Sequence, residues 1–278
     1  MTRRFLKILI PRTFVYVFCI FMSSIAVGPI LIIWMASLKT NTEIYINPLA
    51  LPHYWKFENF ILAWNKTHLG NYMFNSIKVT IPTLALVLIC ASLAGYAFAV
   101  LNFKGKSIIL GLFLIGLVVP TISLIIPLYY TLVDIGLHNT HLGLIFAEAS
   151  QALPLAIYLM RSSFLDMPKE LRESVLTDGG SDFDVFIKVM LPLARPALMS
   201  VMVLSFLQVW NSYLLPLIIL NRDKLLTMPL GLSFLTGRYQ TDQSLLFAAT
   251  TMISLPTVLI YILLQRQFIK GITDGAIK

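Results

Sequence analysis

The chain has 278 residues, of which 58% are hydrophobic and only 12% are charged. Soluble domains carry about 25% charged residues, so this composition excludes a water-soluble protein and indicates an integral membrane protein. The formal net charge of +8 would also suit a nucleic-acid-binding protein, and the positions of the basic residues decide between the two.

Six apolar stretches are long enough to cross a bilayer as helices, which takes about 20 residues each. They cover residues 14–35, 77–101, 108–132, 142–160, 197–220 and 245–264. The first exceeds the apolar core of a cleaved signal peptide, and no clear A-x-A site follows it, so we expect a retained anchor. The sequence therefore predicts an all-α membrane protein with six transmembrane helices in a single domain, 1–278.

The Lys and Arg residues predict the orientation, because cytoplasmic loops carry an excess of them. The N-terminal segment 1–13, the loop near residue 105, the loop 161–196 and the C-terminal tail together hold two-thirds of the 21 basic residues. Both termini are therefore expected in the cytoplasm, and the loops 37–76, 133–141 and 221–244 outside it. Since topology explains the positive charge, no nucleic-acid partner is expected.

Residues that carry chemistry are scarce in the predicted spans. Glu148 is the one ionisable residue that lies clearly within a predicted span. A single carboxylate cannot form a proton relay. The sequence contains no Ser/His/Asp set, zinc-binding H-E-x-x-H helix, phosphate-binding loop or Cys/His cluster. We therefore expect no catalytic residue, no metal site and no cofactor bound by this chain. Ala91, Gly95 and Ala99 recur every four residues, which predicts a close helix-packing face.

The loop 161–196 is predicted to form a helix, a turn and a second helix. Pro168 suits a first helical turn, and Gly179-Gly180 supplies a left-handed stop. Ser181 followed three residues later by Asp184 is a capping-box pattern. One apolar face is expected at helical spacing from Phe183, Phe186, Ile187 and Met190. Such a pair of helices needs a surface to pack on, either the ends of its own spans or a partner protein.

The stretch 168–196, PKELRESVLTDGGSDFDVFIKVMLPLARP, resembles the EAA loop of binding-protein-dependent ABC importer permeases. The residues that fall on the E-A-A-x-x-x-G and x-L-P pattern are Glu173, Asp178, Gly179, Val189, Leu191 and Pro192. Ser174 and Val175 depart from it, because they replace the two alanines, and Gly180 stands where alanine is common. These departures leave the spacing of the motif unchanged.

Further segments resemble the maltose-type sugar permeases, specifically the shorter six-span partner of the pair. They include SLKTNTEIYINP, NSIKVT, GYAFAVLNFKGK, IPLYYTLVDIGLHNTHLGLI, LTMPLGLSFL and the C-terminal QRQFIKGITDGAIK. These matches follow one another in the family's order over nearly the whole chain. The resemblance implies the architecture of a type I ABC importer permease in a bacterial or archaeal cell membrane.

The resemblance also implies partners and contact residues. The expected partners are a second permease subunit, two ATPase subunits that bind ATP and Mg²⁺, and an extracytoplasmic sugar-binding protein, with membrane lipid around them. The loop 161–196 becomes a coupling loop that contacts an ATPase, and the loops 221–244 and 37–76 become candidate contacts of the binding protein. The coupling residues implied are Glu170, Arg172, Glu173, Asp178, Gly179, Leu191 and Pro192.

A sugar pathway needs aromatic rings and amides in an apolar setting, and span five offers Gln208, Trp210, Asn211 and Tyr213. Gln208 and Asn211 share a helix face and Trp210 points elsewhere, so packing or interfacial roles remain open for Trp210 and Tyr213. The alternative functions are a permease for another small polar solute, such as a polyol or glycerol phosphate, and a secondary carrier.

Overall fold

The computed structural model describes residues 12–238 and 242–276, and these form helices joined by turns, with no strand among them. In chain order they are α2 (Arg12–Ala36), α3 (Asn41–Ile46), α4 (Glu58–Lys66), α5 (Leu69–Val100), α6 (Lys106–Ile115), α7 (Thr121–Asp134), α8 (His141–Leu165), α9 (Glu170–Thr177), α10 (Asp182–Asp184), a π-helix (Val185–Met190), α11 (Leu191–Leu193), α12 (Arg195–Trp210), α13 (Leu214–Ile219), a 3₁₀ turn (Asp223–Leu225), α14 (Met228–Arg238) and α15 (Gln243–Ala276). The all-α prediction is confirmed. Residues 1–11 of the expected segment 1–13 lie outside the described residues.

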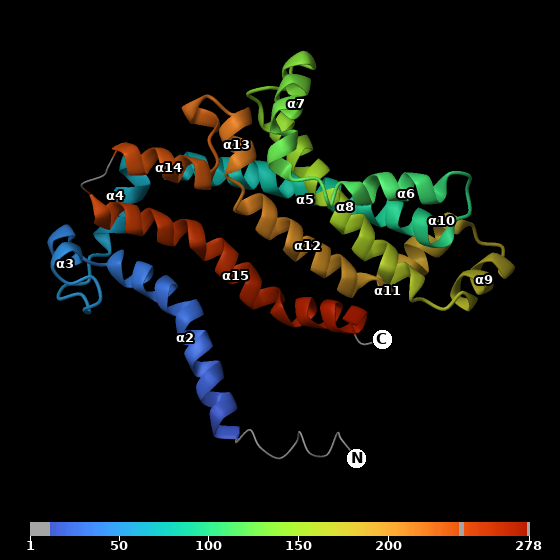
Figure 1. Cartoon of the computed structure of the whole chain (residues 1–278), viewed down its shortest axis with the longest axis horizontal. Coiled ribbons are helices and arrows are strands. Elements are labelled where there is room, and N and C mark those ends of the chain that lie inside the picture. The colour runs from blue at the N-terminus through green and yellow to red at the C-terminus, as the bar shows by residue number, and fades with distance from the viewer. Residues whose placement is uncertain (1–11, 239–241, 277–278) are drawn as a thin grey trace. The chain divides into compact units, whose positions relative to one another are not determined.

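Among the described residues, four helices are long and apolar enough to cross a membrane, and Figure 1 shows the course of these helices. They are Phe14–Ala36, Leu69–Val100, His141–Leu165 and Gln243–Leu263. They contain the first and fourth predicted spans and most of the second and sixth, and α5 begins eight residues before the second. Residues Asp182–Leu193 and Arg195–Trp210 form a further apolar pair, bent by 73°.

Two predicted spans are wrong as continuous helices. Residues 108–132 divide into α6 and α7, of 10 and 14 residues, because Pro120 disfavours helical backbone at the residue before it. Residues 197–220 divide between α12 and α13 at Asn211–Tyr213. Pro216 lies in the first turn of α13, where its missing N–H costs no hydrogen bond, so it permits a new helix start but not continuation of α12.

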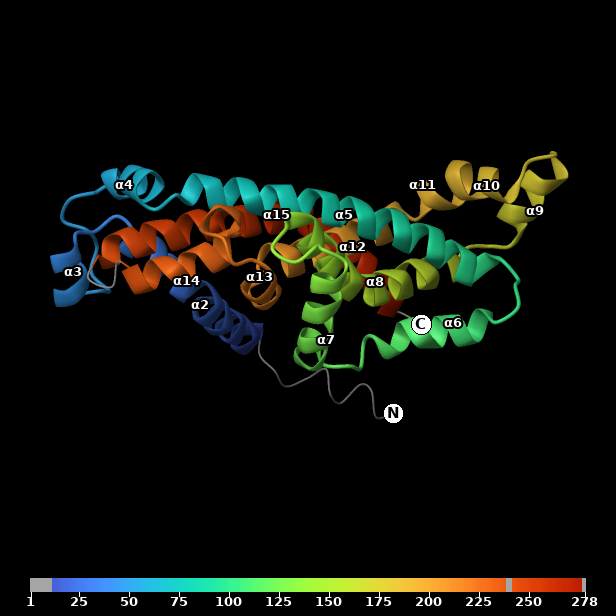
Figure 2. The same ribbon diagram turned by 90° about the horizontal axis from the view of Figure 1, so that it is seen from above.

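The chain forms two compact units. One comprises the described part of Met1–Leu69 with Phe234–Met252, and the other Gly70–Ser233 with the described part of Ile253–Lys278. In the second unit α12 packs against α8, and α9 lies beyond the C-terminal end of α8 (Figure 2).

The predicted small-residue face is a packing face. A Cβ atom on Gly95 would lie 2.7 Å from the Cβ of Met160, so α5 and α8 approach too closely for any larger residue at this position. Ala91 is fully buried in the same cluster, together with Phe164, Phe186 and Met190. This close contact anchors the start of the coupling loop to two membrane helices.

Candidate functional site

The coupling loop presents an acidic surface on α9. Glu170, Glu173 and Asp178 are exposed, whereas Val175 and Leu176 turn inward against the core. A cavity of about 270 Å³ opens beside this surface, and its lining includes Asn102, Lys169 and Glu173. The loop thus presents a row of exposed carboxylates next to a hollow lined by both polar and apolar side chains.

A glycine turn ends α9 as predicted. Gly179 adopts a left-handed conformation with φ of +83°, which residues with a Cβ rarely adopt. The Gly180 amide donates to the Val175 carbonyl at 2.9 Å, and a Cβ on Gly180 would lie 2.6 Å from Val175 Cγ1. The two glycines therefore set the direction in which the chain leaves α9.

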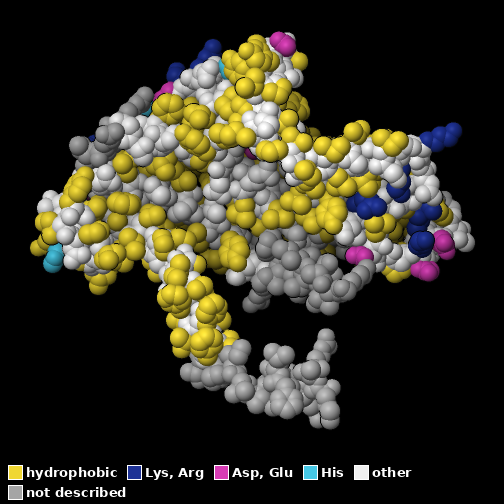
Figure 3. Space-filling view, in the orientation of Figure 1, with side chains coloured by type: hydrophobic (Ala, Val, Ile, Leu, Met, Phe, Trp, Pro, Cys, Tyr) yellow, Lys and Arg dark blue, Asp and Glu magenta, His cyan; other side chains and the backbone are white. Residues whose placement is uncertain are grey.

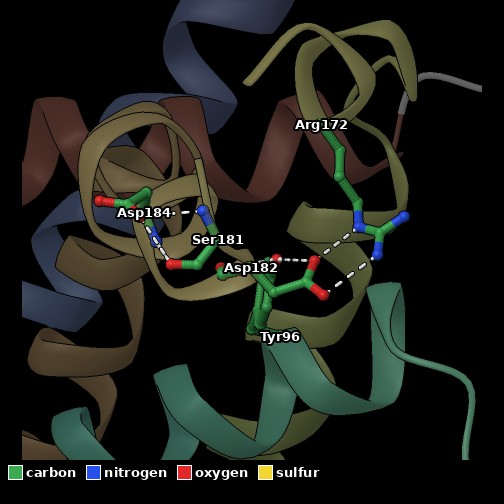
Figure 4. A network of polar contacts seen from close by, with 5 residues as sticks. All are labelled: Tyr96, Arg172, Ser181, Asp182 and Asp184. Atoms are coloured by element: carbon green, nitrogen blue, oxygen red, sulfur yellow. Dashed lines mark hydrogen bonds and ion pairs between the residues drawn. The ribbon is translucent and has the colours of Figure 1, made fainter. Parts of the chain in front are cut away.

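The next helix begins with the predicted capping box. The Asp184 amide donates to Ser181 Oγ at 3.2 Å, and the Ser181 amide donates to Asp184 Oδ2 at 2.9 Å (Figure 4). Lys188 lies one turn further along, with its Nζ 2.6 Å from Asp184 Oδ1. Lys188 and Ser181 together hold the pKa of the Asp184 carboxyl far below its usual range.

Arg172 and Asp182 form a two-pronged ion pair across the glycine turn (Figure 4). Arg172 Nε donates to Asp182 Oδ1 at 2.8 Å, and Nη2 donates to Oδ2 at 3.2 Å. The Asp182 carboxylate raises the pKa of the Arg172 guanidinium. The side chain expected to contact an ATPase is therefore engaged within the loop, where it fixes α9 against α10.

Tyr96 of α5 joins this pair to the membrane helices. Its hydroxyl donates to the Asp182 carbonyl at 3.1 Å. Its ring packs edge-on against Phe164 of α8, with ring centres 5.8 Å apart, and against Phe186 at 5.1 Å. The contact between Tyr96 and Asp182 is not predictable from the sequence, because 86 residues separate them and no local pattern pairs them.

The predicted apolar face of the second helix is only partly correct. Phe186 and Met190 are buried, but Phe183 is 66% exposed and Ile187 is 44% exposed. Phe183, Phe186 and Ile187 nevertheless share one side, as predicted, since all three line an apolar groove with Ile89 and Leu93 of α5. Residues Val185–Met190 adopt a π-helix in place of the expected α-helix.

The four residues proposed for a sugar pathway separate into two groups. Gln208, Asn211 and Tyr213 are exposed near the break between α12 and α13. Trp210 is 4% exposed, stacks on Phe206 and donates from Nε1 to the Ile253 carbonyl at 3.3 Å. Trp210 thus packs inside the unit, as the helix spacing allowed, and does not share a surface with Gln208.

The first part of the loop 221–244 is fastened to α5. Asn75 Nδ2 donates to the carbonyls of Lys224 and Leu226, at 2.8 and 2.9 Å. The Tyr72 hydroxyl donates to Asp223 Oδ1 at 2.9 Å. Met228 donates its amide to Ser76 Oγ at 2.8 Å. These bonds give residues 223–228 one defined path.

Among the described residues, no group of three or more His, Cys, Asp or Glu side chains is placed to hold a metal ion. The features that gather in the coupling loop are a surface of carboxylates, a rigid turn and a connection to α5. Together they suit mechanical contact with another protein.

The coupling loop lies in a part of the chain that is similar to a known protein family. Residues 88–274 match the family model described as the binding-protein-dependent transport system inner membrane component. The chain belongs to this family. The matched region contains the whole coupling loop, together with the α5 turn that carries Tyr96.

Two relatives in this family cover nearly the whole chain. The diacetylchitobiose uptake system permease protein NgcG of Streptomyces coelicolor is 35% identical, over 92% of this chain and 85% of its own. The arabinooligosaccharides transport system permease protein AraQ of Halalkalibacterium halodurans is 34% identical, over 93% of each chain. These similarities extend to the N-terminal residues that precede the family match.

A solved structure shows the same fold. A chain of a bacterial ABC transporter involved in the import of the acidic polysaccharide alginate superposes with a TM-score of 0.80. The match covers 92% of this chain and 97% of the other, with 20% sequence identity. The two chains therefore share one overall fold.

Proposed function

We propose that this chain is the permease subunit of an ATP-driven ABC importer that moves an oligosaccharide, disaccharide or related carbohydrate into the cytoplasm. The observation that carries this proposal is similarity over more than nine-tenths of the chain to permeases named for diacetylchitobiose and arabinooligosaccharide transport. The family's dependence on a binding protein supports delivery of the sugar by an extracytoplasmic protein.

The complete transporter would contain a second permease subunit and two ATPase subunits. ATP and Mg²⁺ would bind in the ATPase subunits, and this chain would contribute no catalytic residue. The excess of basic residues in the coupling loop and the terminal segments supports an orientation with both termini in the cytoplasm. The coupling loop would then face the ATPases from the inner side of the cell membrane.

Coupling in this proposal is mechanical. The exposed carboxylates of Glu170, Glu173 and Asp178 would bond to an ATPase cleft. Gly179 sets the angle of α9, and the bonds from Arg172 to Asp182 and from Tyr96 to Asp182 would carry its displacement to α5. Leu191 and Pro192 continue the loop into α12, which would transmit the same displacement to the divided fifth segment.

Sugar contact is proposed for Gln208, Asn211 and Tyr213. Amides bond to hydroxyl groups and a phenol ring stacks on a sugar face, and all three side chains are accessible near the helix break. Trp210, which is buried and stacks on Phe206, would hold the end of α12 in place beside these three residues.

The test is reconstitution. The tagged chain, co-expressed with its chromosomal neighbours, would be purified in mild detergent, identified with its co-eluting proteins and placed in proteoliposomes loaded with ATP. We expect two ATPase copies, a second permease, and uptake of a labelled saccharide that needs both ATP and the binding protein. A stable homo-oligomer without an ATPase, or uptake abolished by a proton ionophore while ATP remains, would overturn the proposal in favour of a secondary carrier.

A further inference from the structure

In the segment between α2 and α5, polar side chains are buried and large apolar side chains are exposed. Lys39 is fully buried and Asn59 is 9% exposed, whereas Ile46 is 79% exposed and Phe57 is 64% exposed. The other large apolar or aromatic side chains exposed here are Tyr45, Leu49, Leu51, Tyr54, Trp55, Ile61, Leu62 and Trp64. A loop surrounded by water would show the opposite distribution.

The buried polar side chains are hydrogen-bonded. The fold therefore stabilises this arrangement of buried polar and exposed apolar side chains. Lys39 Nζ donates to the carbonyls of Asn47 and Pro48, at 3.1 and 2.9 Å. Asn59 Nδ2 donates to the carbonyls of Ser37 and Lys39, both at 2.9 Å. Polar groups hold the interior of this segment together, and its apolar side chains are left for its surroundings.

The same hydrogen bonds place the segment at the end of a membrane span. α2 presents apolar side chains along its length (Figure 3), and its 23-residue apolar span from Phe14 to Ala36 measures about 35 Å, enough to cross the hydrocarbon layer. Directly after Ala36, the Lys56 amide bonds to the Leu38 carbonyl at 2.9 Å. The start of α4 is thereby tied to the point where the chain leaves the membrane.

α4 itself has three distinct sides. Asn59 and Ala63 are buried against the segment. The N-cap Phe57, with Ile61 and Trp64, forms an exposed apolar side at positions i, i+4 and i+7, and Glu58 and Asn65 are exposed on a third, more polar side on which Leu62 lies between them. A helix with one apolar side and one polar side at the edge of the hydrocarbon is the arrangement of an interfacial helix.

We propose that the segment from Tyr45 to Trp64 lies in the interfacial layer of the bilayer and that its exposed aromatic and apolar side chains contact phospholipid. Tyr and Trp are enriched at this depth because their rings are apolar while their polar atoms reach water and headgroups. A binding protein that docks reversibly is a poorer fit, since such surfaces are no more apolar than the rest of a protein. This inference replaces the expected docking role for this part of residues 37–76.

Spin labelling of the purified transporter in lipid nanodiscs tests the proposal. Cys19 and Cys90 and the cysteines of co-purifying subunits would be replaced, and single labels attached at Ile61→Cys and Tyr45→Cys. Asn65→Cys, on the polar side of α4, is the matched control. Collision with oxygen, which concentrates in lipid, would be compared with collision with a water-soluble nickel chelate.

We expect oxygen to relax the Ile61 and Tyr45 labels more strongly than the nickel chelate does, with the order reversed at Asn65. If the nickel chelate dominates at Ile61 and Tyr45, the segment lies in water and the proposal fails. If neither reagent reaches these two labels, a protein covers them, and the surface belongs to the second permease or the binding protein. Two labels on different helices prevent one perturbed position from deciding the result.

Discussion

The coupling loop and residues 223–228, the part of the loop 221–244 that is bonded to α5, are held by interactions of different range. In the coupling loop the turn and caps join residues within five positions of one another, as in the Gly180 amide to Val175 and the Ser181–Asp184 box. In the second segment the fastening comes from Asn75, about 150 residues away in the sequence. The first arrangement can form before the helices pack, whereas the second exists only after packing.

This difference bears on function. A loop that keeps its own shape can move as a rigid unit, and the bonds from Tyr96 to the Asp182 carbonyl and from Arg161 Nε to the Phe98 carbonyl attach it to α5. A segment whose path depends on α5 will change its path when α5 moves. We therefore expect substitutions in the coupling loop to uncouple ATP hydrolysis from uptake, and substitutions at Asn75 to loosen one segment.

The largest expected effect comes from Gly179→Val. The φ of +83° at this residue costs a β-branched side chain about 1–3 kcal/mol or more, so the turn would open and α9 would change direction. We expect normal insertion into the membrane but loss of ATP-driven uptake in proteoliposomes. Gly111→Val is the matched control, because nothing lies within 4 Å of a Cβ at that helical position. Normal transport by the Gly179 variant would show that the left-handed turn is not needed for coupling.

A smaller effect is expected from Asn75→Asp. The replacement keeps the size of the side chain but removes the donors to the Lys224 and Leu226 carbonyls, and each buried acceptor left unpaired costs about 1–3 kcal/mol. Hydrogen exchange should accelerate in residues 223–228 while the coupling loop keeps its protection. Asn65→Asp, at an exposed position of α4, serves as the control. Equal acceleration in both loops would contradict the distinction between them.

Asp182→Asn tests the attachment of the coupling loop. It removes the charge that pairs with Arg172 but leaves the backbone carbonyl that accepts from Tyr96. Because both side chains of the pair are more than one-third exposed, the loss of stability should not exceed about 1 kcal/mol. We expect ATPase activity to persist while the amount of sugar moved per ATP falls.

Arg172→Lys should produce part of the same loss, since an ammonium group cannot make the two-pronged contact. Tyr96→Phe isolates the remaining bond, because it removes the hydroxyl and retains the ring between Phe164 and Phe186. If all three variants transport as efficiently as the parent chain, this connection does not transmit movement.

The sequence predicted the features that depend on neighbouring residues. Gly179 and the Ser181–Asp184 box were recognised because turns and caps are encoded within a few positions. The breaks near Pro120 and at Asn211–Tyr213 were missed, because the overall length of each apolar stretch favoured one helix. The contacts of Tyr96 and Asn75 were missed since their partners lie far along the chain, and the π-helix over Val185–Met190 was missed because the spacing fitted an ordinary α-helix.

The smallest expected effect concerns the pH dependence of the cap at Ser181. Lys188 and Ser181 hold the pKa of Asp184 below its ordinary value, so the unfolded chain binds the proton more readily than the folded loop does. The resulting stability is present above the unfolded pKa of about 3.9 and is lost as the pH falls through the lower, folded value. Hydrogen exchange of residues 181–190, compared between the parent chain and Asp184→Asn from pH 6 to pH 3, should show a constant difference above about pH 4 that shrinks below it. A difference that persists to pH 3 with undiminished size would show that backbone capping, without the charge, protects this helix start.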